Sequence, residues 1–115
     1  MKKDDSVYLR HILDAITKIE EYTQGIKYKE FMEDNLIQDG VIRQIEIIGE
    51  ATKRLSKEIR KRHPEIPWRD MTGMRDKLIH NYLGVDIDAV WDTVERDIPS
   101  LKTELRNLIK KEEKK

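Results

Sequence analysis

The residue types that could act on a phosphodiester gather in one short segment. Arg75, Asp76 and His80 lie within six consecutive positions. An imidazole can transfer a proton near neutral pH, and a guanidinium can stabilise the negative charge that develops on a phosphorane. A carboxylate one helical turn before a histidine can hold one ring nitrogen and fix the tautomer. The segment therefore has the groups needed for proton transfer at a phosphate, with Asp76 supporting His80.

The same segment supplies only one histidine, which limits what a single chain can do. Cleavage of RNA through its own 2′-hydroxyl needs both an acid and a base. A twofold dimer would bring two copies of His80 to one cleft and meet that requirement. From the pattern alone, a histidine at a helix edge with an aspartate one turn away is more often structural, so the structural interpretation stays open.

The helix that must carry these residues is predicted over residues 67–83, and Gly84 ends it. On a helical wheel, Arg75 falls inside the apolar stripe of this helix, where an unpaired guanidinium is costly. We therefore expect a partner for Arg75, either a phosphate at a helix or subunit seam or a carboxylate such as Glu46 or Glu50. The stripe consists of Met71, Leu78, Ile79 and Tyr82, with Met74 at its edge.

Apolar periodicity predicts helices along the rest of the chain as well. The predicted helices span residues 5–23, 28–34, 36–62, 67–83 and 86–108. Asp4, Asp5 or Ser6 is expected to cap the first of them, and Asp86 the last. The fold class predicted from this pattern is all-α, with one domain over residues 1–115 built as an up-and-down bundle of four to five helices.

Three features of these helices carry expectations about packing. Gly49 has no side chain and is expected to let another helix approach the 36–62 helix closely. Pro99 interrupts the last apolar stripe, which resumes beyond it, so we expect a kink there rather than a helix end. The charged tail from Lys110 to Lys115 is expected to fray.

Two other surface candidates have ordinary explanations. Glu50 and Glu58 interrupt the basic end of the 36–62 helix, so a solvated face with ion pairs one turn apart is favoured over an RNA or partner surface. Trp68 and Trp91 lie in apolar-periodic surroundings and are expected in the core rather than stacked on bases. The basic residues are Lys53, Arg54, Lys57, Arg60, Lys61, Arg62 and His63.

The charge balance limits how the chain can meet nucleic acid. Lys and Arg total 23, Asp and Glu total 23, and the formal net charge is zero. A protein that coats nucleic acid through bulk charge is usually basic, so any RNA contact must come from a local patch. The apolar share is 37%, which gives a monomer a thin core and favours a helical dimer.

Missing residue types and motifs exclude further classes. The chain has no cysteine, which excludes disulfides, a thiol nucleophile and thiolate metal sites. No spacing of His, Asp and Glu resembles a metal site, and no glycine-rich phosphate loop is present, so we expect no metal and no cofactor. No signal peptide or membrane-spanning apolar run is present either, so a soluble, cytoplasmic protein with no membrane contact is expected.

Taken together, these segments resemble a known family. Arg75, four residues, His80, Asn81 and Tyr82 are similar to the R-x-x-x-x-H-x-Y motif of the HepT-like toxins, in the HEPN superfamily of helical ribonucleases. The likeness covers nearly the whole chain and keeps the order of its blocks, which makes it more specific than the short motif alone. The blocks are residues 8–16, 41–51, 63–68, 71–83, 82–86 and 90–91.

The resemblance implies a fold, an activity and a partner that periodicity does not show. It implies a HEPN helical bundle that forms a homodimer, with further assembly left open, and metal-independent endoribonuclease activity on tRNA or mRNA. Arg75 and His80 would be the catalytic pair, with Asp76 as a supporting polar residue. The partner would be an antitoxin, a minimal nucleotidyltransferase of the MntA type, which neutralises the toxin by adenylylating Tyr82.

Adenylylation of Tyr82 would be physically effective. On the predicted helix the tyrosine lies close to Arg75, so an adenylyl group would place negative charge and bulk where an RNA phosphate must sit. The ordinary interpretation is that Tyr82 is an amphipathic core residue with its hydroxyl at the rim. Position alone favours that interpretation, and the resemblance favours modification.

Two non-enzymatic hypotheses remain beside the ribonuclease. The chain could be a helical binding module that docks a nucleotidyltransferase or a nucleotide without cleaving RNA, which the zero net charge slightly favours. It could also be a purely structural dimer. Substitution of His80 separates the first alternative from an enzyme, and substitution of Arg75 separates the second.

Overall fold

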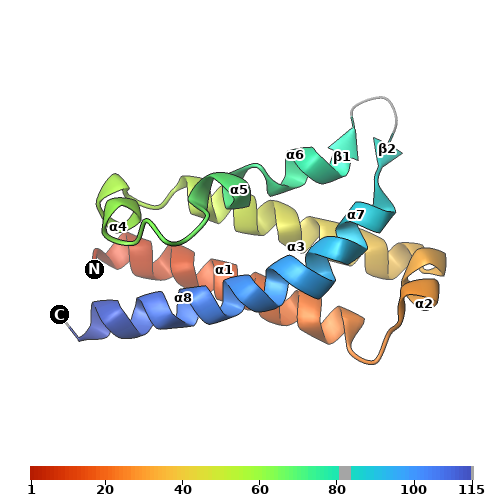
Figure 1. Cartoon of the computed structure of the whole chain (residues 1–115), viewed down its shortest axis with the longest axis horizontal. Helices are drawn as coiled ribbons and strands as arrows, with labels where there is room; N and C mark the ends of the chain where they lie inside the picture. The colour runs from red at the N-terminus through yellow and green to blue at the C-terminus, as the bar shows by residue number, and fades with distance from the viewer. Residues whose placement is uncertain (81–83, 115) are drawn as a thin grey trace.

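Two long helices packed side by side form the frame of the molecule (Figure 1). The computed structural model describes residues 1–80 and 84–114, with the backbone alone at His80. The helices are α1 (Lys3–Thr23), α2 (Tyr28–Glu33), α3 (Asn35–Lys53), α4 (Lys57–Arg62), α5 (Trp68–Thr72), α6 (Met74–Leu78), α7 (Ile87–Asp92) and α8 (Ile98–Glu113). A π-helical turn, η1 (Thr93–Asp97), joins the last two, and the two-residue strands β1 (Ile79–His80) and β2 (Gly84–Val85) pair antiparallel. The predicted all-α bundle is confirmed.

The core lies between α1, α3 and α8, and their apolar stripes are buried as the periodicity predicts. Each stripe has a spacing of three and four residues, which places its side chains on one face of its helix. The buried stripes include Leu9, Ile12, Ile16 and Ile19 on α1, Val41, Ile45 and Ile48 on α3, and Leu101, Leu105 and Leu108 on α8. Trp68 and Trp91 pack against this core, as expected.

The helix predicted over residues 36–62 is divided into α3 and α4, so that prediction is wrong. Ser56 begins α4 as its N-cap, with the side chain accepting a hydrogen bond from the Ile59 amide. The buried Asp5 carboxylate of α1 accepts hydrogen bonds from the Ser56 amide at 2.8 Å and from its hydroxyl at 2.6 Å. Asp5 therefore stabilises the break instead of capping its own helix, which has no side-chain cap.

The last helix changes its hydrogen-bond pattern just before Pro99, the residue where a kink was expected. Proline has no amide hydrogen to donate, so the α-helical ladder cannot run through Pro99 unchanged. In η1 the Ile98 amide donates to the Thr93 carbonyl, five residues back, which inserts a π-turn between α7 and α8. The apolar stripe continues across the turn, with Val94 and Ile98 both buried. Asp86 caps α7, as predicted, by accepting a hydrogen bond from the Ala89 amide.

The C-terminal end of α8 is held by a buried carboxylate, so the prediction of a frayed tail is wrong as far as Glu113, where the helix ends. The Glu112 side chain is 0% exposed and accepts hydrogen bonds from the Arg62 guanidinium at 2.7 and 3.2 Å. The His63 Nε2 lies 2.5 Å from the same carboxylate. The bond to Glu112 raises the pKa of Arg62 above its ordinary value. This cluster joins the end of α8 to the end of α4.

No helix among the residues the structure describes has the length and apolar character that crossing a bilayer requires.

Replacing Glu112 with alanine is expected to destabilise the fold by about 3 kcal/mol, because the change leaves Arg62 and the buried His63 without their shared partner. The exposed neighbour Glu113 provides the matched control, and Glu113→Ala is expected to change stability by less than about 0.5 kcal/mol. Chemical denaturation followed by circular dichroism measures both variants. Equal midpoints for the two variants would contradict the structural role given to Glu112.

Candidate active site

The segment with Arg75, Asp76 and His80 is not a single helix, so the prediction of a helix over residues 67–83 is wrong. Gly73 ends α5, and α6 then runs only from Met74 to Leu78. Ile79 and His80 are extended and pair with Val85 and Gly84.

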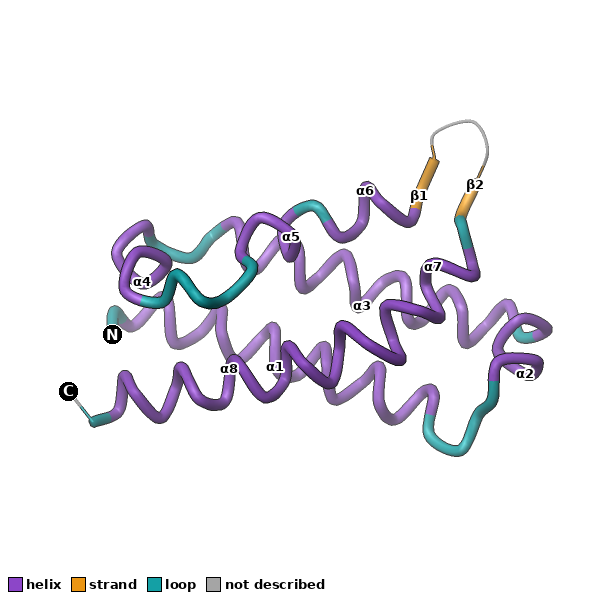
Figure 2. The backbone as a smooth tube through the Cα atoms, viewed as in Figure 1, coloured by secondary structure: helices purple, strands orange, loops and turns teal. Residues whose placement is uncertain are grey.

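A hydrogen bond between Asp86 and Leu78, residues that are not neighbours in the sequence, explains why α6 ends where it does. The Asp86 amide donates to the Leu78 carbonyl at 2.8 Å, which joins the end of α6 to the start of α7. Gly84 has a φ of 83°, a backbone conformation that side-chain-bearing residues rarely adopt. The two short strands on either side of the undescribed residues are paired antiparallel (Figure 2). A helical wheel considers only local spacing and cannot include this pairing.

The early end of α6 changes the predicted relation between Asp76 and His80. The two residues are not one turn apart on a common helix, because the chain is extended from Ile79 onward. Asp76 is exposed on α6. The side chain of His80 and all of Tyr82 lie outside the described residues. Because α6 ends at Leu78, the prediction that Tyr82 lies close to Arg75 on one helix no longer follows.

Arg75 is on the surface rather than inside an apolar stripe, which corrects the expectation of burial. Its side chain is 50% exposed, while Met71, Met74 and Leu78 of the same two helices are buried. The helix ends at Leu78 and Ile79 is extended, so the buried stripe consists of Met71, Met74 and Leu78 and no longer centres on Arg75.

The expected carboxylate partner of Arg75 is confirmed for Glu46 and wrong for Glu50. The Arg75 Nε lies 3.4 Å from Glu46 Oε2, and the Glu46 side chain is 33% exposed. Glu50 instead forms an ion pair with Lys53, three residues along α3, at 3.5 Å. The guanidinium therefore keeps one carboxylate neighbour at a site that solvent and a ligand can reach.

The close approach of α5 to α3 brings α6 into reach of Glu46, and Gly49 is the contact point, as predicted. A Cβ atom at Gly49 would lie 3.5 Å from the Met71 carbonyl oxygen and 3.6 Å from that of Thr72. Those distances leave space for about one methyl group and not for a larger side chain. Glu46 is one turn before Gly49 on α3. The contact between α5 and Gly49 therefore also brings the next helix, α6, with Arg75, close to Glu46.

The base of the β1–β2 hairpin is anchored by aromatic residues of α2 that pack on α7. The Tyr28 hydroxyl donates a hydrogen bond to Asp88, which raises the pKa of Tyr28. Phe31 packs against Trp91 with ring centroids 5.0 Å apart. The sequence analysis missed the hairpin, and Gly84 followed by the capping residue Asp86 was its one local signal.

The basic residues predicted at the end of the long helix are partly used within the fold. Arg62 and His63 point to Glu112, and Lys53 pairs with Glu50. Arg60 donates a hydrogen bond to the Leu55 carbonyl. These contacts favour the ordinary interpretation of that surface, although its residues lie on two helices instead of one.

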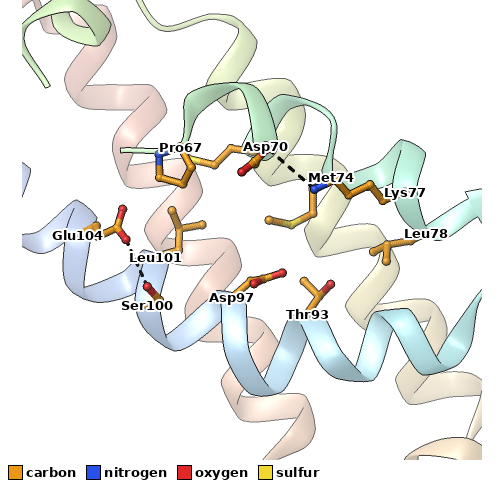
Figure 3. Close-up of a pocket in the computed structure, with 11 residues that line it drawn as sticks. Pro67, Asp70, Met74, Lys77, Leu78, Thr93, Asp97, Ser100, Leu101 and Glu104 are labelled. Carbon is orange, nitrogen blue, oxygen red and sulfur yellow. Dashed lines mark hydrogen bonds and ion pairs between the residues drawn. The ribbon is translucent and has the colours of Figure 1, made fainter. Parts of the chain in front are cut away.

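A cavity of about 150 Å³ lies between the α5–α6 segment and the η1–α8 segment, and it does not include Arg75 or Glu46 (Figure 3). Its lining has three carboxylates, Asp70, Asp97 and Glu104, against a single cation, Lys77. Lys77 is 3.9 Å from Asp70, which leaves the lining net acidic. An acidic cavity repels phosphate, so the Arg75 surface is the better place for an RNA backbone. Within the described part of the chain, no group of three His, Cys, Asp or Glu residues could hold a metal ion.

Comparison of the sequence with known proteins assigns the chain to a family. The family model described as "Ribonuclease HepT-like" matches residues 12–108. The chain belongs to the HepT-like ribonuclease family. The match includes all eight described helices in whole or in part, together with Arg75, Asp76, His80 and Tyr82. The family suggested by the sequence motif is therefore confirmed.

Individual relatives in the HepT-like family agree with this assignment. A protein named probable ribonuclease HepT, from Thermococcus cleftensis, is 50% identical over 110 residues, covering 96% of this chain and 100% of that protein. A protein of Caldanaerobacter subterraneus named as a candidate RNase is 41% identical, covering 91% of this chain and 94% of its own length. A relative from Methanocaldococcus jannaschii, named for both a gamma-glutamylcyclotransferase and an RNase, is 46% identical, and the match covers 51% of that protein. No solved structure matched the chain.

Replacing Arg75 with alanine is expected to change the free energy of unfolding by no more than about 1 kcal/mol, because its ion pair is at the surface. Glu46→Ala is expected to behave the same way. Thermal and chemical denaturation measure both. A loss of about 3 kcal/mol or more in either variant would place the pair in the folding core and contradict the surface site described above.

Proposed function

We propose that this protein is a metal-independent endoribonuclease that acts on tRNA or mRNA as the toxin of a toxin–antitoxin pair. The observation that carries the proposal is an exposed guanidinium, Arg75, in the R-x-x-x-x-H motif of a chain that belongs to the HepT-like ribonuclease family. The side chain is accessible and lies on a short helix five positions before His80.

The proposed reaction uses the 2′-hydroxyl of the RNA as the nucleophile. A base removes the hydroxyl proton while its oxygen forms a bond to the adjacent phosphorus, and the bond from phosphorus to the 5′-oxygen breaks. An acid returns a proton to that 5′-oxygen, which leaves a cyclic phosphate and a free 5′-hydroxyl. His80 serves in proton transfer, and Arg75 stabilises the charge on the phosphorane. Asp76 is the supporting polar residue of the motif.

The reaction also accounts for the proposed homodimer. One chain contributes one motif histidine, whereas the reaction needs an acid and a base at the same phosphate. Two copies of the motif facing one cleft supply both. Because the net charge is zero, bulk electrostatics do not draw the chain to RNA, and the proposed binding relies on a local site that includes Arg75.

Replacing either catalytic residue is expected to reduce cleavage by about a hundredfold or more while the fold is kept. Arg75→Ala and His80→Ala are compared with Lys77→Ala, an exposed cation on the same helix as Arg75. The assay follows cleavage of a mixed tRNA and mRNA substrate in buffer containing EDTA, and Lys77→Ala is expected to remain active. Cleavage that disappears in EDTA and returns with a divalent metal would contradict the metal-independent mechanism.

The binding-module hypothesis gives a different result in the same assay. The net charge is zero, so bulk electrostatics alone do not draw the chain to RNA, and this favours the binding-module hypothesis. If His80→Ala leaves RNA cleavage and growth arrest unchanged, the enzyme proposal fails. A module that docks a nucleotidyltransferase without cleavage then becomes the better hypothesis.

The proposed antitoxin is an MntA-type nucleotidyltransferase that adenylylates Tyr82. In that transfer the tyrosine oxygen bonds to the α-phosphorus of ATP, pyrophosphate leaves, and the phenolic proton passes to a base. The added group carries negative charge and bulk within the motif segment, which would repel an RNA phosphate.

The intact mass of the protein, co-produced with a neighbouring nucleotidyltransferase, tests this proposal. We expect an increment of one or more adenylyl groups that Tyr82→Phe abolishes. Tyr22→Phe, at a partly exposed tyrosine of α1, is the matched control and should keep the increment. An unmodified protein that still co-purifies tightly with its partner would contradict adenylylation and indicate inhibition by occlusion.

A further inference from the structure

The contact between Glu46 and Arg75 occupies only one edge of the guanidinium. Glu46 Oε2 lies 3.4 Å from Arg75 Nε. That is the closest approach of the two side chains, and Arg75 has no other ion pair or hydrogen bond with a described residue. A guanidinium binds phosphate most strongly through two parallel N–H groups. The edge with Nη1 and Nη2 can therefore bind a phosphate while Glu46 stays in place.

We propose that Glu46 is a positioning residue of the ribonuclease, which holds Arg75 by its Nε side and turns the two terminal nitrogens toward the scissile phosphate. The inference rests on the proposed function, because it gives Glu46 a role only if Arg75 meets RNA. Glu46 itself touches neither the phosphate nor the reacting oxygens.

The short length of α6 explains why the arginine needs such a partner. Five residues make little more than one turn, and an isolated helix of that length is not stable in water. Gly73 precedes α6 and the extended pair Ile79–His80 follows it. Arg75 also has a long side chain with many rotamers, so its own backbone does little to fix the guanidinium.

Glu46, in contrast, comes from the best-supported part of the molecule. Its neighbours on α3, Ile45 and Ile48, are almost fully buried against the core. One turn further on, Gly49 seats the end of α5 against the same helix. A carboxylate on this rigid face can therefore set the direction of a side chain on the less supported α6.

The negative charge of Glu46 gives the positioning role a signature that a purely structural residue lacks. A carboxylate near a phosphate repels it, so Glu46 should weaken RNA binding slightly while it speeds the chemical step. Removing the side chain should then slow cleavage without weakening binding. Glutamine keeps an oxygen that can accept from Nε and removes the charge, so Glu46→Gln should preserve the orientation of Arg75.

The test combines single-turnover cleavage with RNA binding measured by fluorescence anisotropy. For Glu46→Ala we expect a cleavage rate about tenfold lower than wild type and RNA affinity at least equal to wild type. Glu46→Gln is expected to cleave close to the wild-type rate. Glu50→Ala is the matched control, one turn along α3, and should cleave like wild type because Glu50 pairs with Lys53.

Three results would overturn the proposal: a wild-type rate for Glu46→Ala, equally slow rates for Glu46→Ala and Glu46→Gln, or the same loss in Glu50→Ala. The Arg75→Ala variant separates this failure from failure of the proposed function. If Arg75→Ala is inactive and Glu46→Ala is unimpaired, only the positioning role falls. If Arg75→Ala cleaves like wild type, both the ribonuclease proposal and the positioning role of Glu46 fail.

Discussion

The packing of α1 against α3 is the constraint on which the other elements depend. Buried apolar stripes on the two helices pack against each other, and the remaining helices attach to the sides of this seam. The end of α5 reaches α3 at Gly49, and α8 lies along α1. The position of Arg75 depends on this seam. Its short helix follows α5 onto the face of α3 where Glu46 lies.

Hydrophobic spacing was enough to predict the helical bundle and most of its buried residues. Leu55 and Ile59 are spaced four residues apart within the predicted 36–62 helix and both are buried, although Leu55 lies in the break between α3 and α4. The break depends on Asp5 binding Ser56 across 51 positions of sequence. The hairpin likewise depends on the bond between Asp86 and Leu78. Local periodicity contains neither contact, so both breaks had to come from the folded structure.

The candidate site shows how a correct partner can follow from an incorrect premise. Glu46 was expected beside Arg75 because a buried guanidinium needs a carboxylate, yet Arg75 is half exposed. The wheel failed because the helix ends at Leu78, so Ile79 does not belong to its apolar stripe. The choice of Glu46 succeeded because α3 packs closely against that segment. Asp76 was paired with His80 on the same wheel, and the end of α6 at Leu78 removes that geometric argument. The family motif is independent of the wheel, and it alone supports a shared role for the two.

The cluster around Glu112 has a further consequence for the shape of the molecule. The N-terminal amine of Met1 is 3.8 Å from the Glu112 carboxylate, so the first residue and the end of α8 meet at one pole (Figure 1). The β1–β2 hairpin, which continues from α6, projects near the other pole. Polypeptide joined to either terminus would therefore begin at the same pole, beside the Glu112 cluster and away from β1 and β2.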